Sequence, residues 1–262
     1  LGPLSMLCAV ALNVDPGQLQ PKISLMALSP DPSILRGAEM FAGLPDAVLG
    51  EVLSAGRVRR LPAGMVVFAQ GDPGETCHSL LHGRVKVVQT RSDGGQHVLR
   101  YIGPGEMYGT VAALMGRPFP ADAIAVVESL AVFWTVEAMR ALMAAHPDIG
   151  LRATAGAGER LMELQSRVGE LSAERVEQRI ARALVRLVRQ AGRRTEEGVE
   201  IDFPITRQEL AEMSGSTLHT ASRTLSAWEE RGIVKSGRRR IVVVKPHALI
   251  AVAEDLGGKE DQ

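Results

Sequence analysis

The chain has 262 residues, 45% of them hydrophobic, and its 30 Lys and Arg residues equal its 30 Asp and Glu residues. That length allows two compact domains, and the balanced charge means that any signal for a nucleic-acid partner must be local. The two cysteines, Cys8 and Cys77, exclude a disulfide framework and favour a reducing, cytoplasmic location. The apolar stretch from Met6 to Val14 is far shorter than the ~20 residues of a membrane span, so no membrane partner is expected.

The first half of the sequence predicts a flexible extension followed by a β domain. Residues 1–35 show no clear periodicity and are expected to be poorly ordered. Residues 36–146 consist of short apolar runs separated by turns rich in Gly and Pro, a spacing typical of an antiparallel β-roll, or jelly roll. The best strand candidates are Met65–Ala69, Arg84–Gln89, His97–Ile102, Ala123–Val127 and Ala131–Val136.

A long helix is predicted over residues 147–172, because no proline follows Pro147 for more than forty residues and the apolar spacing becomes helical. Steps of three and four indicate the seam of a two-stranded coiled coil, so we expect a dimerisation helix. The alternative is a single amphipathic helix lying on its own domain. A second helix is expected over about 173–192. The predicted seam comprises Gly150, Thr154, Ala157, Leu161, Leu164, Val168 and Leu171.

Residues 173–262 are expected to form a winged helix-turn-helix domain. Thr206 is a candidate N-cap, Glu209 completes a capping box, and Gly215 permits a tight turn before a second helix that Ser216 can cap. Apolar residues of this second helix recur at spacings of four and three and predict its buried face. These are Ala221, Leu225 and Trp228.

The opposite face of the second helix is polar and carries one arginine, as expected of a helix that enters a DNA major groove. A hairpin with a cationic tip follows, and residues 203–245 include roughly eight basic and four acidic residues. The partner expected from this pattern is double-stranded DNA. The candidate DNA-binding residues are Arg207, Thr217, Leu218, His219, Ser222, Arg223, Arg238, Arg239 and Arg240.

From about Phe41 to Ala253 the chain resembles the Crp/Fnr family of bacterial transcription regulators. The resemblance implies an α+β fold with β-roll, dimer helix and winged helix-turn-helix, a homodimer on a pseudo-palindromic operator, and RNA polymerase as a further partner. It also implies that Arg223 reads guanine and that Ser222 contacts a base, while His219 replaces the family's usual glutamate and leaves the base preference open. The family resemblance rests on the segments Ile205–Leu210, Gly215–Leu225, Gly71–Val88 and Arg160–Leu171.

The sensor positions depart from those of cyclic-AMP-binding members of the family. Those members hold the phosphate with a Gly-Glu pair and a later Arg-Ser pair, where this chain has Gly109, Thr110, Pro120 and Ala121. A cyclic phosphate would lack its charge partner, so cyclic AMP is disfavoured. Cys8 alone cannot replace the cysteine cluster of the oxygen-sensing branch. The expected effector-pocket residues are His97, Gly109, Thr110, Leu164 and Gln165.

The signal itself stays open at this point. One of His78, His82 and His97 could ligate a haem iron, although a strand histidine is more often structural. Cys77 could sense oxidants or be an ordinary buried thiol. The leading hypothesis is a transcription regulator gated by an effector, redox or gas signal. The alternative is a small-molecule-binding or scaffold module without DNA-binding output, and no catalytic motif supports an enzyme.

Overall fold

The computed structural model describes residues 31–90 and 95–255. Most of the predicted N-terminal extension lies outside these residues. The described chain begins with the 3-10 helices η1 (Pro32–Gly37) and η2 (Glu39–Phe41), followed by α2 (Asp46–Ser54). Leu35 is fully buried in a cluster with Phe41 and Trp134. The expectation that the extension reaches residue 35 is therefore wrong for residues 31–35.

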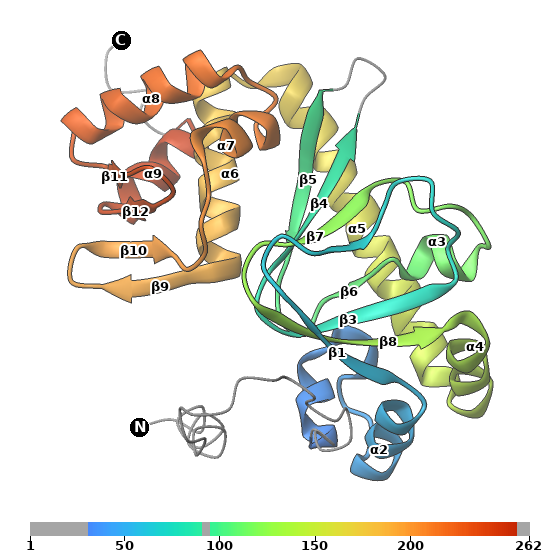
Figure 1. Cartoon of the computed structure of the whole chain (residues 1–262). Coiled ribbons are helices and arrows are strands. Elements are labelled where there is room, and N and C mark those ends of the chain that lie inside the picture. The colour runs from blue at the N-terminus through green and yellow to red at the C-terminus, as the bar shows by residue number, and fades with distance from the viewer. Residues whose placement is uncertain (1–30, 91–94, 256–262) are drawn as a thin grey trace, which may run out of the picture. The chain divides into compact units, whose positions relative to one another are not determined.

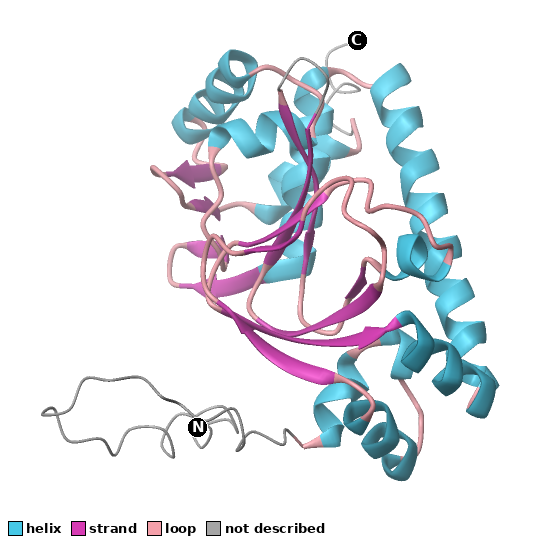
Figure 2. Ribbon diagram, turned by 45° about the vertical axis from the view of Figure 1, so that its right-hand side comes forward, coloured by secondary structure: helices cyan, strands magenta, loops and turns pink. Residues whose placement is uncertain are grey.

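Two four-stranded antiparallel sheets form the β-roll (Figures 1 and 2). Side chains from both sheets share one core, including Leu61 and Leu80 from one and Val85 and Ile102 from the other, so the sheets pack face to face. The first sheet has the order β1 (Arg57–Leu61), β8 (Ser129–Thr135), β3 (Thr76–His82), β6 (Met107–Tyr108), and the second has β2 (Val66–Phe68), β7 (Asp122–Ala125), β4 (Val85–Thr90), β5 (Gln96–Ile102).

The five predicted strands all exist, with ends that differ by one or two residues, whereas β1, β3 and β6 were not predicted. Strand β1 contains three arginines and pairs along its whole length with β8. Strand β3 contains Cys77, His78 and Ser79, which are all buried although two of them are polar. Tertiary burial thus outweighs the polar composition of β3, whereas β1 is held by its pairing with β8 although its arginines are exposed.

Helices α3 (Thr110–Leu114) and α4 (Val136–Ala145) lead to the long helix α5 (Pro147–Ala173), which confirms the predicted long helix. Helix α6 (Val176–Ala191) follows after a break, because Glu174 has extended backbone angles and Arg175 caps α6. The boundary expected between residues 172 and 173 therefore lies at Glu174–Arg175.

The C-terminal domain contains α6, the helix pair α7 (Arg207–Met213) and α8 (Leu218–Glu230), and the terminal helix α9 (Pro246–Ala253). Its antiparallel sheet has the order β11 (Val234–Ser236), β12 (Ile241–Val243), β10 (Gly198–Ile201), β9 (Gly192–Thr195). Leu184, Leu210 and Trp228 are fully buried in its core. The predicted winged helix-turn-helix is confirmed. No helix of the described ranges is long and apolar enough to span a membrane.

Candidate functional site

The turn between α7 and α8 has the geometry of a helix-turn-helix. Thr206 Oγ1 accepts a hydrogen bond from Glu209 N at 3.1 Å, and Thr206 N donates to Glu209 Oε2 at 2.9 Å, which is the predicted capping box. Gly215 has φ +62°, a left-handed conformation that suits glycine. Thr217, and not Ser216, caps α8, because Thr217 Oγ1 accepts from Thr220 N at 3.2 Å. The predicted cap at Ser216 was one residue too early.

Helix α8 has one buried and one exposed face. The predicted stripe Ala221, Leu225 and Trp228 is fully buried, and Trp228 Nε1 donates to Glu177 Oε1 at 2.8 Å. On the other face, Arg223 is exposed and forms no hydrogen bond or ion pair with any described residue. The neighbouring face residues Thr217, Leu218 and His219 are exposed, and Ser222 is half-buried.

The arginines of the basic hairpin differ in their partners. Arg238 and Arg239 are exposed, and neither makes a salt bridge to a described carboxylate. Arg240 instead pairs with Glu200 at 2.7 Å and Glu197 at 3.1 Å. The tip therefore offers two guanidinium groups that are available to phosphates.

Arg207, at the start of α7, also has partners within the domain. Its guanidinium donates to Ser236 Oγ at 2.6 Å and lies 3.5 Å from a Glu229 carboxylate oxygen. These contacts join α7 to α8 and to the end of β11 next to the hairpin tip, which gives Arg207 a structural role whether or not it contacts DNA.

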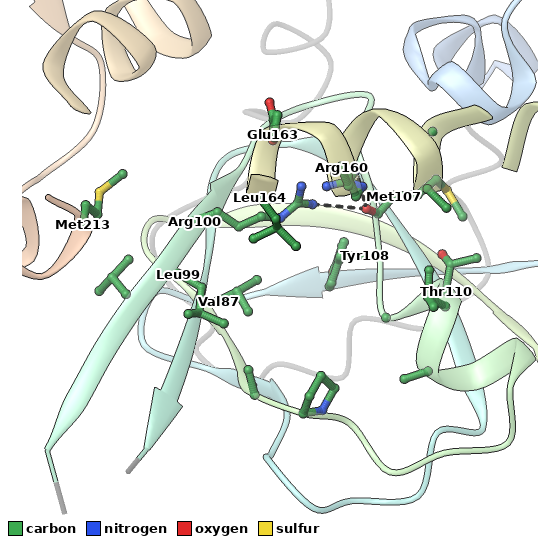
Figure 3. A pocket seen from close by; sticks show the side chains of 18 of the residues that line it. Val87, Leu99, Arg100, Met107, Tyr108, Thr110, Arg160, Glu163, Leu164 and Met213 are labelled. Atoms are coloured by element: carbon green, nitrogen blue, oxygen red, sulfur yellow. Dashed lines mark hydrogen bonds between the residues drawn. The ribbon is translucent and has the colours of Figure 1, made fainter. Parts of the chain in front are cut away.

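The roll, α5 and residues of α6 and α7 line an open cavity of about 730 Å³ (Figure 3). Four of the five predicted pocket residues, His97, Gly109, Thr110 and Leu164, line it, and Gln165 does not. Most of its wall is apolar, a composition typical of small-molecule sites. The apolar wall includes Val87, Leu99, Tyr108, Val111, Phe119 and Leu164.

The end of the cavity at Gly109 differs in its residues from that of cyclic-AMP-binding members. Gly109 has φ +73°, and a Cβ there would lie 3.0 Å from the Phe119 ring, so glycine is required. Pro120 and Ala121 line this end, at the positions where cyclic-AMP-binding members have an Arg-Ser pair. The residues present do not fit a cyclic phosphate.

Two arginines that the sequence did not single out for the pocket lie at the α5 side. Arg100 on β5 and Arg160 on α5 both donate to the Met107 carbonyl oxygen, at 3.4 and 3.3 Å (Figure 3). Arg160, which directly precedes the seam position Leu161, lines the cavity. The helical spacing of Ala153, Gly156, Ala157, Arg160 and Leu164 could have indicated this face.

The three candidate haem ligands lie in different environments. His78 is buried, with its ring centroid 5.0 Å from Tyr108 and 5.4 Å from Phe68. His82 is exposed at the end of β3. Neither of these two lines the large cavity, whereas His97 does.

Cys77 is fully buried, and this burial raises the pKa of its thiol to about 12, against a smaller opposing effect of Thr110. Thiolate is the form that reacts with oxidants. The environment of Cys77 therefore favours a structural thiol over a redox sensor.

Burial of His78 makes the free energy of unfolding depend on pH. Burial lowers the pKa of His78 from 6.5 to about 4, against a smaller opposing effect of the Tyr108 backbone. The unfolded state binds a proton at His78 more readily than the folded state does. The stability that neutral His78 contributes is therefore complete above pH 6.5 and is lost as the pH falls toward 4. We expect the free energy of unfolding to fall by about 3 kcal/mol over this range from His78 alone.

His78→Gln should remove this part of the acid dependence in urea titrations between pH 7 and 4. His82→Gln, which changes an exposed histidine on the same strand, is the matched control and should keep it. Equal acid slopes for the parent and the His78 variant would contradict the assignment.

The β4–β5 hairpin and α7 make direct polar contacts. Lys86 Nζ lies 2.9 Å from Glu209 Oε1, and Val98 N donates to Glu212 Oε2 at 3.2 Å. Burial alone would raise the pKa of Glu209, but Lys86 and Thr206 hold it below its usual value. The carboxylate that caps α7 is thus also bound by the roll.

Comparison with known proteins matches both halves of this architecture. Residues 58–146 match the family described as Cyclic nucleotide-binding domain, and residues 178–252 match the Crp-like helix-turn-helix domain. The chain is 32% identical over 221 residues to the Cyclic AMP receptor protein of Thermus thermophilus, covering 84% of this chain and 98% of that protein. The chain belongs to the Crp/Fnr family. It is accordingly a transcription regulator with an effector-binding type of domain and a DNA-binding domain.

Two further matches have names that record different signals. The chain is 26% identical to the Global nitrogen regulator of Synechocystis, covering 77% of this chain and 90% of that protein. Its fold resembles that of the c-di-GMP responsive regulator CLP of Xanthomonas campestris, with a TM-score of 0.66 and 22% identity over 76% of this chain and 99% of that one. Family membership therefore does not specify the effector.

Proposed function

We propose that this Crp/Fnr protein is a homodimeric regulator that binds pseudo-palindromic DNA through α8 and responds to a ligand in the roll cavity. The observation that carries the proposal is the exposed face of α8, where Arg223 is free of partners among the described residues, beside a hairpin tip with two arginines that no described carboxylate pairs. Arg223 would read a guanine, and Thr217, Leu218, His219 and Ser222 would contact neighbouring bases or phosphates.

Dimerisation is supported by apolar side chains that α5 leaves exposed. Leu161 is 58% and Val168 64% exposed, both at predicted seam positions. Leu151 and Met162 extend this surface beyond the predicted seam, with 72% and 68% exposure. Large exposed apolar surfaces commonly mark an interface, and a second copy of α5 matches the coiled-coil spacing. The alternative of a helix packed only on its own domain leaves these residues uncovered.

Gating would use the contacts between roll and helix-turn-helix. The pair Lys86–Glu209 lies between the strand that borders the cavity wall and the cap of α7. A ligand that shifts β4, β5 or α5 would change these contacts, and the break at Glu174–Arg175 would allow the DNA-binding domain to reorient. Haem bound through His97 stays one candidate signal, and cyclic AMP is disfavoured by Pro120 and Ala121.

Further parts of the proposal follow from the family. RNA polymerase would be the partner through which DNA binding affects transcription, and the cytoplasm would be its location. Its relatives are transcription regulators, which are not enzymes, and we propose the same for this chain.

The salt dependence of DNA binding tests the proposed interface. Removing the two tip charges in Arg238→Gln/Arg239→Gln should reduce the slope of log K against log salt by about 1 for each phosphate that the protein no longer neutralises. Fluorescence anisotropy with random-sequence duplex DNA measures this slope.

Arg240→Gln is the matched variant in the same hairpin. Because Glu197 and Glu200 already pair with Arg240, it should change the slope less than the double variant does. Absence of binding by the parent protein even at low salt would instead support a binding module without DNA-binding output.

A further inference from the structure

We infer that the roll cavity binds a monocarboxylate with a mainly apolar body, its carboxylate paired with Arg160 and Arg100. The inference rests on the proposed function in taking the cavity as the effector site. The arrangement that points to it is a mainly apolar cavity in which Arg160 of α5 and Arg100 of β5 both contact the Met107 carbonyl oxygen. Pro120 and Ala121 occupy the positions where a cyclic phosphate would need an Arg-Ser pair.

The walls favour an apolar body. Val87 and Leu99 come from the β4–β5 hairpin, and Tyr108 and Phe119 add aromatic rings to the lining. Phe119 stacks on Phe68 with ring centroids 3.8 Å apart, which makes one wall a continuous aromatic surface. A volume of about 730 Å³ is within the range that encloses a small organic molecule. A sugar-phosphate body would leave its hydroxyl groups against these apolar side chains without partners.

The cationic end favours one negative charge. Arg160 donates to the Met107 carbonyl oxygen, and no described carboxylate lies within salt-bridge distance of it. Arg100 reaches the same carbonyl oxygen, and its nearest carboxylate, Glu106 at 3.5 Å, is itself bound by Gln190. The pair therefore presents positive charge that the protein only partly neutralises.

Burial supports this assignment. It lowers the pKa of the Arg160 guanidinium, and the more distant charges of Glu39 and Glu163 only partly oppose it. An arginine nevertheless remains protonated in a protein. A ligand carboxylate between Arg160 and Arg100 would make charge-assisted hydrogen bonds that compensate for the reduced solvation. Glu39 and Glu163 also line the cavity and would oppose a second negative charge.

The position of this anion site connects it to the dimer surface. Arg160 and Leu164 both lie on α5 and line the cavity, while Leu164 is also 58% exposed. A carboxylate drawn to Arg160 would fix the helix that carries Leu161 and Val168. Ligand binding and pairing of the two α5 helices would therefore be coupled.

The test compares three probes on the full chain by isothermal titration calorimetry: decanoate, decan-1-ol and cyclic AMP. Decanoate should bind at least 10-fold more tightly than decan-1-ol, which has the same body without the charge, and cyclic AMP should not compete. Arg160→Gln should weaken decanoate binding roughly 10- to 100-fold and remove the preference over decan-1-ol. Arg160→Lys, which keeps the charge, should weaken it less.

Arg57→Gln, on the exposed strand β1, is the matched control and should bind decanoate as the parent does. Arg100→Gln is a second test should Arg160→Gln fail to fold. Equal affinity for decanoate and decan-1-ol, no binding of decanoate, or tighter binding of cyclic AMP would each overturn the inference. Random-sequence DNA binding on the same samples distinguishes the two proposals, because DNA binding without carboxylate binding refutes only the ligand class.

Discussion

Arg223→Ala is expected to weaken binding to a selected operator by about 2–6 kcal/mol, or roughly 30-fold to 10⁴-fold. Each bidentate contact of an arginine with guanine contributes about 1–3 kcal/mol of discrimination, and a homodimer makes the contact twice. The effect should be confined to sequence-specific binding. Electrophoretic mobility shift with the operator and with a scrambled duplex measures both affinities.

Arg223→Ala should change DNA binding without changing the stability of the protein. Its side chain is exposed and forms no hydrogen bond or ion pair with a described residue, so the melting temperature should change little. Ser226→Ala, on the same helix and half-buried, serves as the matched control and should retain most affinity. Unchanged operator binding by Arg223→Ala would show that another residue reads the DNA.

Leu161→Glu is expected to convert the dimer into monomers. Burying a leucine at an interface contributes about 1.5–3 kcal/mol, and each dimer buries two copies, so the dissociation constant should rise at least 100-fold. The glutamates would also face each other across the seam. Sedimentation equilibrium measures the change, and operator binding should fall with it because two linked domains bind far more tightly than one.

Met115→Glu is the control for this variant. Met115 is as exposed as the seam residues, at 66%, but follows α3 and is not part of the α5 seam. It should leave the dimer intact. A Leu161→Glu protein that stays dimeric and binds DNA normally would show that the dimer interface lies elsewhere.

The DNA-binding half was predictable from sequence because its signals are local. The capping box at Thr206 and Glu209, the turn at Gly215 and the stripe ending at Trp228 each follow from spacing within a few residues. The tertiary contacts of the arginines in this half could not be predicted from local spacing. Arg207 and Arg240 were expected only to contact DNA, yet their partners Glu229, Glu197 and Glu200 lie on other elements.

The sensor half was only partly predictable, because its key contacts join distant segments. The sequence showed that Pro120 and Ala121 remove the phosphate partner, and it placed four of the five expected residues in the cavity. It could not show that Arg100 and Arg160, from β5 and α5, meet at the Met107 carbonyl. Strand β3 was missed for a similar reason, since only the roll core explains why His78 and Ser79 are buried.

Selection of bound duplexes from a random DNA pool, followed by sequencing, tests the proposed mode of DNA binding most directly. Two α8 helices on a dimer should enrich two inverted half-sites centred about 10 base pairs apart, one turn of DNA. Arg223→Ala should relax the preference at one position in each half. Enrichment of a single half-site, or of no sequence, would contradict the symmetric, base-reading regulator.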